Sequence, residues 1–312
     1  MKTIDKDNMF QSIWDFPENI IDALKISEEI KIKNDYENVN KVIVAGMGGS
    51  AIGGDVVNSL IEEDINIPFI VNRGYNLPAW VDSSTLIICS SYSGNTEETL
   101  SILEKANSIN AKVIGITTGG KLETLCGKYD YDKVLIPSGL QPRAALAFSF
   151  IPLLCVLKKV GVINTDIEPW LHSAAKLIKS KRIEYSEDEG KNPVWALANK
   201  IYSKLPIIYA DSDGLDTVAI RLKGQICENS KILAYHNIYP EMNHNEIVGW
   251  HNNAEYFSNY FVLWVMDKDM NERNKSRQSI ISNILSNLKV KQEIIEVAVS
   301  YTHLTLPTNR EV

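Results

Sequence analysis

Residues 84–109, where a strand turns directly into a helix through a run of hydroxyl side chains, constrain this chain more than any other stretch. The apolar segment Ser84–Cys89 predicts a buried strand, and apolar residues recur at helical spacing from Glu97 to Ile109. The residues between these segments include the hydroxyl residues Ser91, Ser93 and Thr96 and one glycine, Gly94. A single hydroxyl would be explained as an ordinary helix cap. Three of them beside a helix N-terminus predict an anion site, most naturally for a phosphate.

Strands and helices alternate along the rest of the chain. We predict strands at 41–45, 68–71, 86–89, 112–117 and 133–137 in the first half, and at 205–210, 231–234, 257–266 and 293–299 in the second, where helices are expected at 217–228 and 275–288. This alternation predicts parallel sheets covered by helices on both faces. We therefore expect an α/β fold with two doubly wound, mostly parallel-sheet domains. The first should span residues 1–155 with leading helices, and the second residues 156–298 with a helical linker.

Composition indicates the compartment of the protein and argues against some classes of partner. The net charge of −7 argues against a nucleic-acid partner and against a basic membrane-binding patch. The four cysteines are scattered without a Cys-x-x-Cys pair, which is typical of a reducing compartment without disulfides. The N-terminus has no apolar signal region, and the longest apolar run, 144–157, contains Pro152 and is short for a membrane span. We expect a cytoplasmic protein without a membrane partner.

A glycine-rich loop, Gly46–Ser50, follows the first predicted strand and opens a helix. Its spacing, continued to Ala51, formally satisfies the dinucleotide-binding fingerprint, so an NAD-binding domain is a competing interpretation. That fingerprint also requires an acidic residue at the end of the second strand, where this chain has Asn72 and Arg73. We prefer a site in which the backbone of Gly48 and Gly49 approaches a sugar and Ser50 adds a donor to its phosphate.

Three polar residues are candidates for chemistry at the ends of predicted elements. Glu228 and His244 could transfer protons, and Arg143 could stabilise an oxyanion. Each also has an ordinary explanation: a solvated helix-end carboxylate, a hydrogen-bonded loop histidine and a surface ion pair. The chain has no His-x-x-x-His pair, no Glu-x-x-His pair and no Gly-x-Ser-x-Gly elbow. We therefore expect neither a metal ion nor a cofactor.

Five motifs together resemble one family. They are Gly46-Met-Gly-Gly-Ser50, Ser91-Tyr-Ser-Gly-Asn-Thr96, Gln141-Pro-Arg143, Glu228-Asn-Ser-Lys231 and His244-Asn-Glu-Ile-Val-Gly249. The family is that of the bifunctional phosphoglucose/phosphomannose isomerases, which are built from two sugar-isomerase (SIS) domains. The resemblance covers roughly residues 8 to 297. It implies an enzyme of carbohydrate metabolism, in glycolysis or gluconeogenesis, that interconverts glucose 6-phosphate or mannose 6-phosphate with fructose 6-phosphate through a cis-enediol.

The resemblance also implies roles for individual residues. The 6-phosphate would be held by Ser50, Ser91, Ser93 and Thr96, with backbone contacts from Gly48 and Gly49. Arg143 would stabilise the enediolate, Glu228 would move the proton between C1 and C2, and His244 would help to open the sugar ring. In relatives this histidine reaches the neighbouring subunit's site, which implies a homodimer.

The C-terminal residues depart from the family pattern. We expect residues 299–312 to be a non-native tail in place of a closing helix that carries a lysine and a threonine in relatives, and therefore weak or absent activity. Two other functions remain open for the same fold. One is a non-catalytic SIS-type protein that binds sugar phosphates, and the other is an amino-sugar phosphate isomerase, which this sequence does not distinguish.

Overall fold

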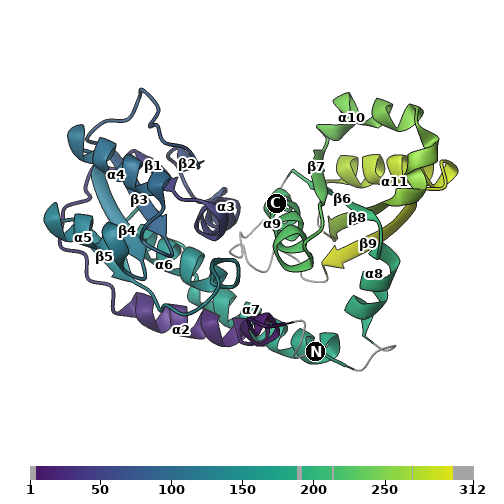
Figure 1. The fold of residues 1–312 in the computed structure, drawn as a ribbon. Helices are drawn as coiled ribbons and strands as arrows, with labels where there is room; N and C mark the ends of the chain where they lie inside the picture. The colour runs from purple at the N-terminus through teal and green to yellow at the C-terminus, as the bar shows by residue number, and fades with distance from the viewer. Residues whose placement is uncertain (1–4, 188–191, 213, 269, 298–312) are drawn as a thin grey trace, which may run out of the picture. The chain divides into compact units, whose positions relative to one another are not determined.

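The chain divides into two compact units, Met1–Ile183 and Glu184–Val312 (Figure 1). The computed structural model describes residues 5–187, 192–212, 214–268 and 270–297, so the expected non-native tail at 299–312 lies outside the described residues. The division falls after the expected one between residues 155 and 156, because helix α7 (Glu168–Tyr185) buries Leu171 and Ala175 in the core of the first unit. Among the described helices, none combines the length and the apolar character of a membrane span.

The first unit contains five parallel strands in the order β2-β1-β3-β4-β5. These strands are β1 Lys41–Ala45, β2 Phe69–Asn72, β3 Thr85–Ser91, β4 Lys112–Thr117 and β5 Asp132–Leu135. The helices are α1 Met9–Trp14, α2 Phe16–Glu28, α3 Gly48–Ile61, α4 Glu97–Ser108, α5 Gly120–Lys128 and α6 Leu146–Lys159, with a short 3₁₀ helix, η1, at Pro142–Ala144. The predicted doubly wound parallel sheet is confirmed.

Alternate residues of β1 face opposite sides of this sheet. Val42 and Val44 belong to a buried cluster with residues of α2, α3, α6 and α7, whereas Ile43 and Ala45 pack with residues of α4 and α5. Successive side chains of a strand point to opposite faces, so a strand that is apolar at every position can bury both. Helices therefore cover both faces of the sheet.

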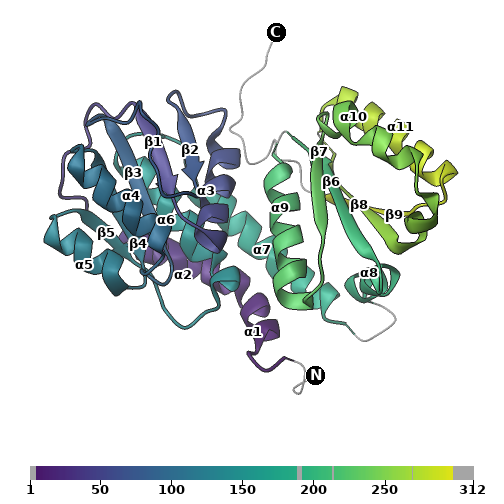
Figure 2. The ribbon, with the colours of Figure 1, turned by 45° about the horizontal axis from the view of Figure 1, so that its top comes forward.

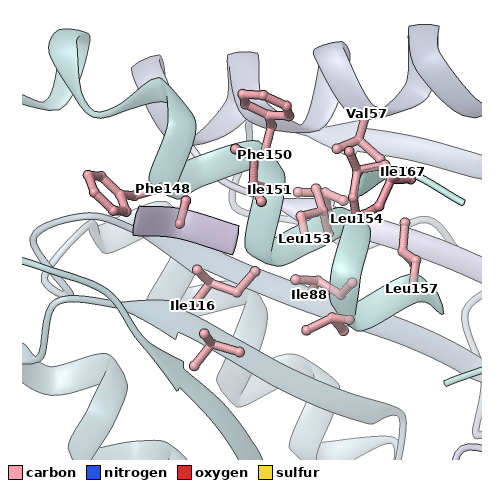
Figure 3. Packing of buried hydrophobic residues seen from close by; sticks show 14 of the residues in the cluster. Val57, Ile88, Ile116, Phe148, Phe150, Ile151, Leu153, Leu154, Leu157 and Ile167 are labelled. Atoms are coloured by element: carbon pink, nitrogen blue, oxygen red, sulfur yellow. The ribbon is translucent and has the colours of Figure 1, made fainter. Parts of the chain in front are cut away.

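Helix α6 contributes most of one of these faces. Its apolar run is buried almost continuously, and Figure 3 shows Leu153 and Leu154 between Val57 of α3 and Ile88 of β3. Pro152 lies inside the helix without ending it. The longest apolar run of the chain is therefore a core helix of the first unit, as its length predicted.

The second unit contains four parallel strands in the order β7-β6-β8-β9 (Figure 2). These are β6 Leu205–Asp211, β7 Tyr235–Tyr239, β8 Tyr260–Asp267 and β9 Lys291–Val297. Its helices are α8 Pro193–Ile201, α9 Asp216–Gln225, α10 Met242–Asn245 and α11 Glu272–Asn287, with a π-helix, η2, at Ile226–Ser230 and 3₁₀ helices η3 at Ile247–His251 and η4 at Ala254–Asn259. Separate buried clusters line its two faces, which confirms a second α/β sheet.

One predicted strand of this unit was wrong in position, and one predicted helix differs in type at its end. The strand expected at 231–234 lies at Tyr235–Tyr239, because Lys231 adopts a left-handed conformation with φ of 58° that ends the helical run. The helix expected at 217–228 is α-helical only to Gln225 and then widens into the π-helix. Glu228 therefore lies within a π turn.

Candidate functional site

The two phosphate-site motifs lie at one edge of the first sheet. Helix α3, which follows β1, buries Val57 on one face of the sheet, whereas α4, which follows β3, buries Ile102 on the other. Because β1 and β3 are neighbours, the chain leaves their carboxyl ends in opposite directions. Such a switch point creates a crevice where ligands bind in doubly wound folds. Both Gly46–Ser50 and Ser91–Thr96 are at this switch point.

Hydrogen bonds join the hydroxyl residues of the two motifs. The hydroxyls of Ser91 and Thr96 lie 2.8 Å apart, and the backbone N–H of Tyr92 donates to Ser50 Oγ at 3.3 Å. Ser91 and Ser50 are buried, whereas Ser93 is exposed and its Oγ accepts from Asn95 N at 3.2 Å. The structure thus brings the four predicted phosphate-binding hydroxyl residues into one connected pair of loops.

Thr96 allows a test of the simpler explanation that these hydroxyls are helix caps. It occupies the N-cap position of α4, but its side chain makes no capping hydrogen bond within the described part of the chain. Its hydroxyl pairs with Ser91 instead. A capping oxygen would have satisfied an N–H group of the first turn. The arrangement leaves these N–H groups to another acceptor, which is what an anion site requires.

Two glycines allow the loops around this site to approach each other closely. Gly94 has φ of +68°, and a Cβ atom there would lie 1.8 Å from the carbonyl oxygen of Gly119. A Cβ atom on Gly49 would lie 2.6 Å from the carbonyl oxygen of Pro142. Gly49 therefore has a packing reason to be glycine, in addition to any contact with a substrate. Gly48 has φ of +49° and space around its Cβ position.

Arg143 lies in a turn that is attached to both loops. The turn is held by Gly49 on one side, and on the other Leu140 N donates to the phenolic oxygen of Tyr92 at 3.0 Å. Arg143 is half-buried, and its Nη1 donates to Gln141 Oε1 at 3.5 Å. The first unit therefore places an arginine beside the hydroxyl cluster.

Tyr92 is a residue whose role the sequence did not reveal. Its N–H, its carbonyl and its phenol each contact a different segment: Ser50 Oγ, Thr118 Oγ1 at 2.7 Å and Leu140 N. Burial raises the pKa of its phenol, so the group stays protonated at neutral pH. The sequence does show an aromatic residue between two serines of the motif. Its hydrogen-bond partners, however, are distant in the sequence, so the motif alone does not predict these contacts.

The competing dinucleotide interpretation gains no support at the end of β2. Arg73 forms an ion pair with Asp55, and Asn72 Oδ1 accepts from Gly74 N at 2.8 Å. A dinucleotide site would need a carboxylate here to bind the ribose hydroxyls. The end of β2 instead presents an amide and a paired guanidinium.

Glu228 and His244 belong to the second unit. Glu228 is exposed in the π-helix, and π turns occur frequently at functional sites. Burial lowers the pKa of nearby Arg221, while the Glu228 carboxylate acts in the opposite direction, so the two groups attract each other. His244 is exposed on α10, where its backbone N–H donates to Glu241 O at 2.9 Å.

Comparisons with known proteins were made for the whole chain. Residues 35–138 match the model of the SIS domain, and residues 190–303 match that of the bacterial phospho-glucose isomerase C-terminal SIS domain. The chain is 44% identical over 282 residues to a bifunctional phosphoglucose/phosphomannose isomerase of Caldicellulosiruptor bescii, covering 90% of this chain and 83% of the relative. It is 36% identical to the protein of the same name from Aquifex aeolicus, covering 83% and 77%.

The fold of this chain is similar to that of solved structures. The C-terminal domain of glucosamine-fructose-6-phosphate aminotransferase from Francisella tularensis superposes with a TM-score of 0.64 at 18% identity. The match covers 92% of this chain and 83% of that structure.

Proposed function

The chain belongs to the family of the bifunctional phosphoglucose/phosphomannose isomerases, and on that premise we propose that it interconverts glucose 6-phosphate or mannose 6-phosphate with fructose 6-phosphate. The observation that carries this proposal is the hydroxyl cluster at the switch point of the first sheet. Ser50, Ser91, Ser93 and Thr96 offer hydroxyl donors beside the N-termini of α3 and α4. Such a group suits a dianionic sugar phosphate.

The isomerisation needs a base and a means of stabilising negative charge. Glu228 removes the proton from C2 of the open-chain aldose, and the electron pair forms the C1–C2 double bond while the C1 carbonyl π bond opens to leave negative charge on O1. A proton then moves from O2 to O1, and the same carboxyl returns its proton to C1 as the C2 carbonyl forms. Charge develops on the substrate oxygens during this transfer, and Arg143 stabilises it. Before it, His244 assists ring opening by proton transfer at the ring oxygen. These residues supply the proton transfers and the charge stabilisation that the reaction requires.

Replacing Ser93 by Ala tests the phosphate assignment. We expect binding of glucose 6-phosphate to weaken by roughly 1.5 to 3 kcal/mol, because a hydroxyl that donates to a charged phosphate is lost. Isothermal titration calorimetry measures the change. Ser108→Ala is a matched control, since its exposed hydroxyl donates to Lys105 O at the far end of α4. Equal affinities of the two variants would remove Ser93 from the phosphate site.

We also propose a homodimer in which His244 acts in the active site of the partner subunit. The exposed position of His244 on the short helix α10 is compatible with this role. Each active site would then combine Glu228 of one subunit with His244 of the other. A mixed dimer, with one Glu228→Gln subunit and one His244→Ala subunit, would have one site in which both residues are intact.

Subunit mixing should therefore restore activity. The Glu228→Gln and His244→Ala proteins should each be strongly impaired. When equal amounts of them are unfolded and refolded together, about a quarter of the wild-type activity is expected, since half of the dimers are mixed and each has one intact site. The two proteins refolded separately and then assayed together are the control. Equal activity in both preparations would place His244 in its own subunit's site.

Two alternative functions, sugar-phosphate binding without catalysis and amino-sugar phosphate isomerisation, can be distinguished by assays with different substrates. A non-catalytic sugar-phosphate-binding protein would bind glucose 6-phosphate without converting it, and an amino-sugar isomerase would act on glucosamine 6-phosphate instead. We propose that the protein works in the cytoplasm, where these phosphorylated sugars are metabolised. An assay of glucose 6-phosphate, mannose 6-phosphate and glucosamine 6-phosphate with one preparation separates the possibilities.

A further inference from the structure

Glu246, two residues after His244, accepts hydrogen bonds from side chains of two neighbouring strands of the second sheet, β6 and β7. Its carboxylate accepts from the hydroxyl of Tyr209 in β6. It also accepts from the hydroxyl of Tyr235 at 2.9 Å and from Asn237 Nδ2 at 2.5 Å, both in β7. One carboxylate therefore joins the end of α10 to two neighbouring strands.

The partner on β6 is itself firmly held. Tyr209 is fully buried, and its hydroxyl accepts from Trp250 Nε1 at 3.2 Å while donating to Glu246. Trp250 packs against Phe257 with ring centroids 5.2 Å apart. Burial and the neighbouring Glu246 raise the pKa of both Tyr209 and Tyr235, so both phenols remain donors near neutral pH. The carboxylate thus meets a constant set of donors.

Helix α10 depends on this anchorage for its position. It has only four residues, and so short a helix is not stable by itself. Met242, which is fully buried, and Glu246 are four residues apart and lie on the same side of the helical turn. His244, halfway between them in sequence, is exposed. The helix is thus fixed at two points of its inner side, and its outer side presents the imidazole.

We propose that Glu246 is a positioning residue that holds His244 in the orientation needed for ring opening. The inference rests on the proposed function, because His244 is the group on which Glu246 acts. A displacement of about 1 Å in a reacting group can reduce the rate of a reaction about a hundredfold. Loss of the Glu246 anchor should therefore lower turnover without changing the phosphate site, which is built from residues of the first unit.

Glu246→Gln tests this role, because the amide keeps the size of the side chain but replaces an acceptor oxygen by a donor. We expect kcat for glucose 6-phosphate to fall roughly 10- to 100-fold with little change in KM. Glu241→Gln is the matched control, since this exposed carboxylate of the same segment accepts only a local bond from Asn245 Nδ2 at 2.8 Å among the contacts described. Equal kcat values for the two variants would overturn the inference.

A double-mutant cycle separates positioning from a general structural effect. If Glu246 acts through His244, adding Glu246→Gln to His244→Ala should cause no further loss of kcat. Losses that multiply would overturn the positioning role. A parent chain that is inactive both as given and with the closing helix of its relatives in place of residues 299–312 would instead overturn the proposed function, which distinguishes the two failures.

A measurement without substrate keeps the inference testable in every case. The NMR signal of the His244 ring, assigned by its disappearance in His244→Ala, should shift or broaden in Glu246→Gln and stay in place in Glu241→Gln. An unchanged signal in both would overturn the inference. If Glu246→Gln does not fold, Tyr235→Phe is the alternative, because it removes one of the three hydrogen-bond donors to Glu246 at an exposed position. It should lower kcat severalfold and shift the NMR signal of the His244 ring in the same way.

Discussion

Replacing Glu228 by Gln is expected to lower kcat for glucose 6-phosphate isomerisation by roughly 10² to 10⁴-fold, because the amide cannot accept the proton from C2. Binding of the sugar phosphate should change little, since we propose that the hydroxyl groups of the first unit bind the phosphate. The variant should therefore show a reduced kcat at nearly constant affinity, which is the signature of an interaction that matters in the transition state. Steady-state kinetics and calorimetric titration measure the two quantities.

Glu255→Gln provides the comparison for this variant. Glu255 is an exposed carboxylate of η4 in the same unit, and its loss should leave kcat near the wild-type value. Wild-type turnover in Glu228→Gln would exclude Glu228 as the base. A loss of affinity at wild-type turnover would instead assign it to substrate binding.

Replacing Gly94 by Ala is expected to produce the largest loss of stability. The residue has φ of +68°, and the new methyl group would lie 1.8 Å from the carbonyl oxygen of Gly119 and 2.8 Å from Thr117 Oγ1. The left-handed conformation costs about 1 to 2 kcal/mol for a residue with a side chain, and overpacking costs about 1 to 3 kcal/mol more. The free energy of unfolding of the first unit should therefore fall by about 2 to 5 kcal/mol.

Urea denaturation followed by fluorescence and circular dichroism measures this loss, with the two units treated as separate transitions. Gly127→Ala is the control. It makes the same substitution in α5, where, apart from the adjoining backbone of the helix, no atom of the described residues lies within 4 Å of the new methyl group. An alanine in a helix should raise stability there by about 0.5 to 1 kcal/mol. Equal stabilities of Gly94→Ala and Gly127→Ala would contradict the close contact between the loops at Gly94 and Gly119.

The sequence predicted the first unit well because its signals are local. Strands such as β1 and β3 are short apolar runs, each followed by a helix with apolar spacing, and this alternation admits few topologies. The second unit was predicted less accurately at β7. This edge strand contains polar, partly exposed residues such as His236 and Asn237, so it lacks the apolar run that marks a buried strand.

The candidate site was predictable where its residues adjoin in sequence. The Ser91–Thr96 motif and the Gly46–Ser50 loop each follow a strand, and parallel topology places both at one edge. The contacts of Tyr92 with Ser50 and of Glu246 with Tyr209 join residues 42 and 37 positions apart. Such side-chain contacts depend on how the helices pack on the sheet. Periodicity and local motifs do not contain that information.

The most direct test of the proposed function is the conversion of fructose 6-phosphate in deuterium oxide, followed by NMR, by the purified chain and by a version in which the closing helix of its relatives replaces residues 299–312. We predict that glucose 6-phosphate and mannose 6-phosphate both form, and that part of each product contains deuterium at C2, because the proton held by Glu228 exchanges with solvent during the enediolate stage. Glu228→Gln should form neither product at a comparable rate. Absence of both aldose phosphates with both proteins would contradict the proposed isomerase activity.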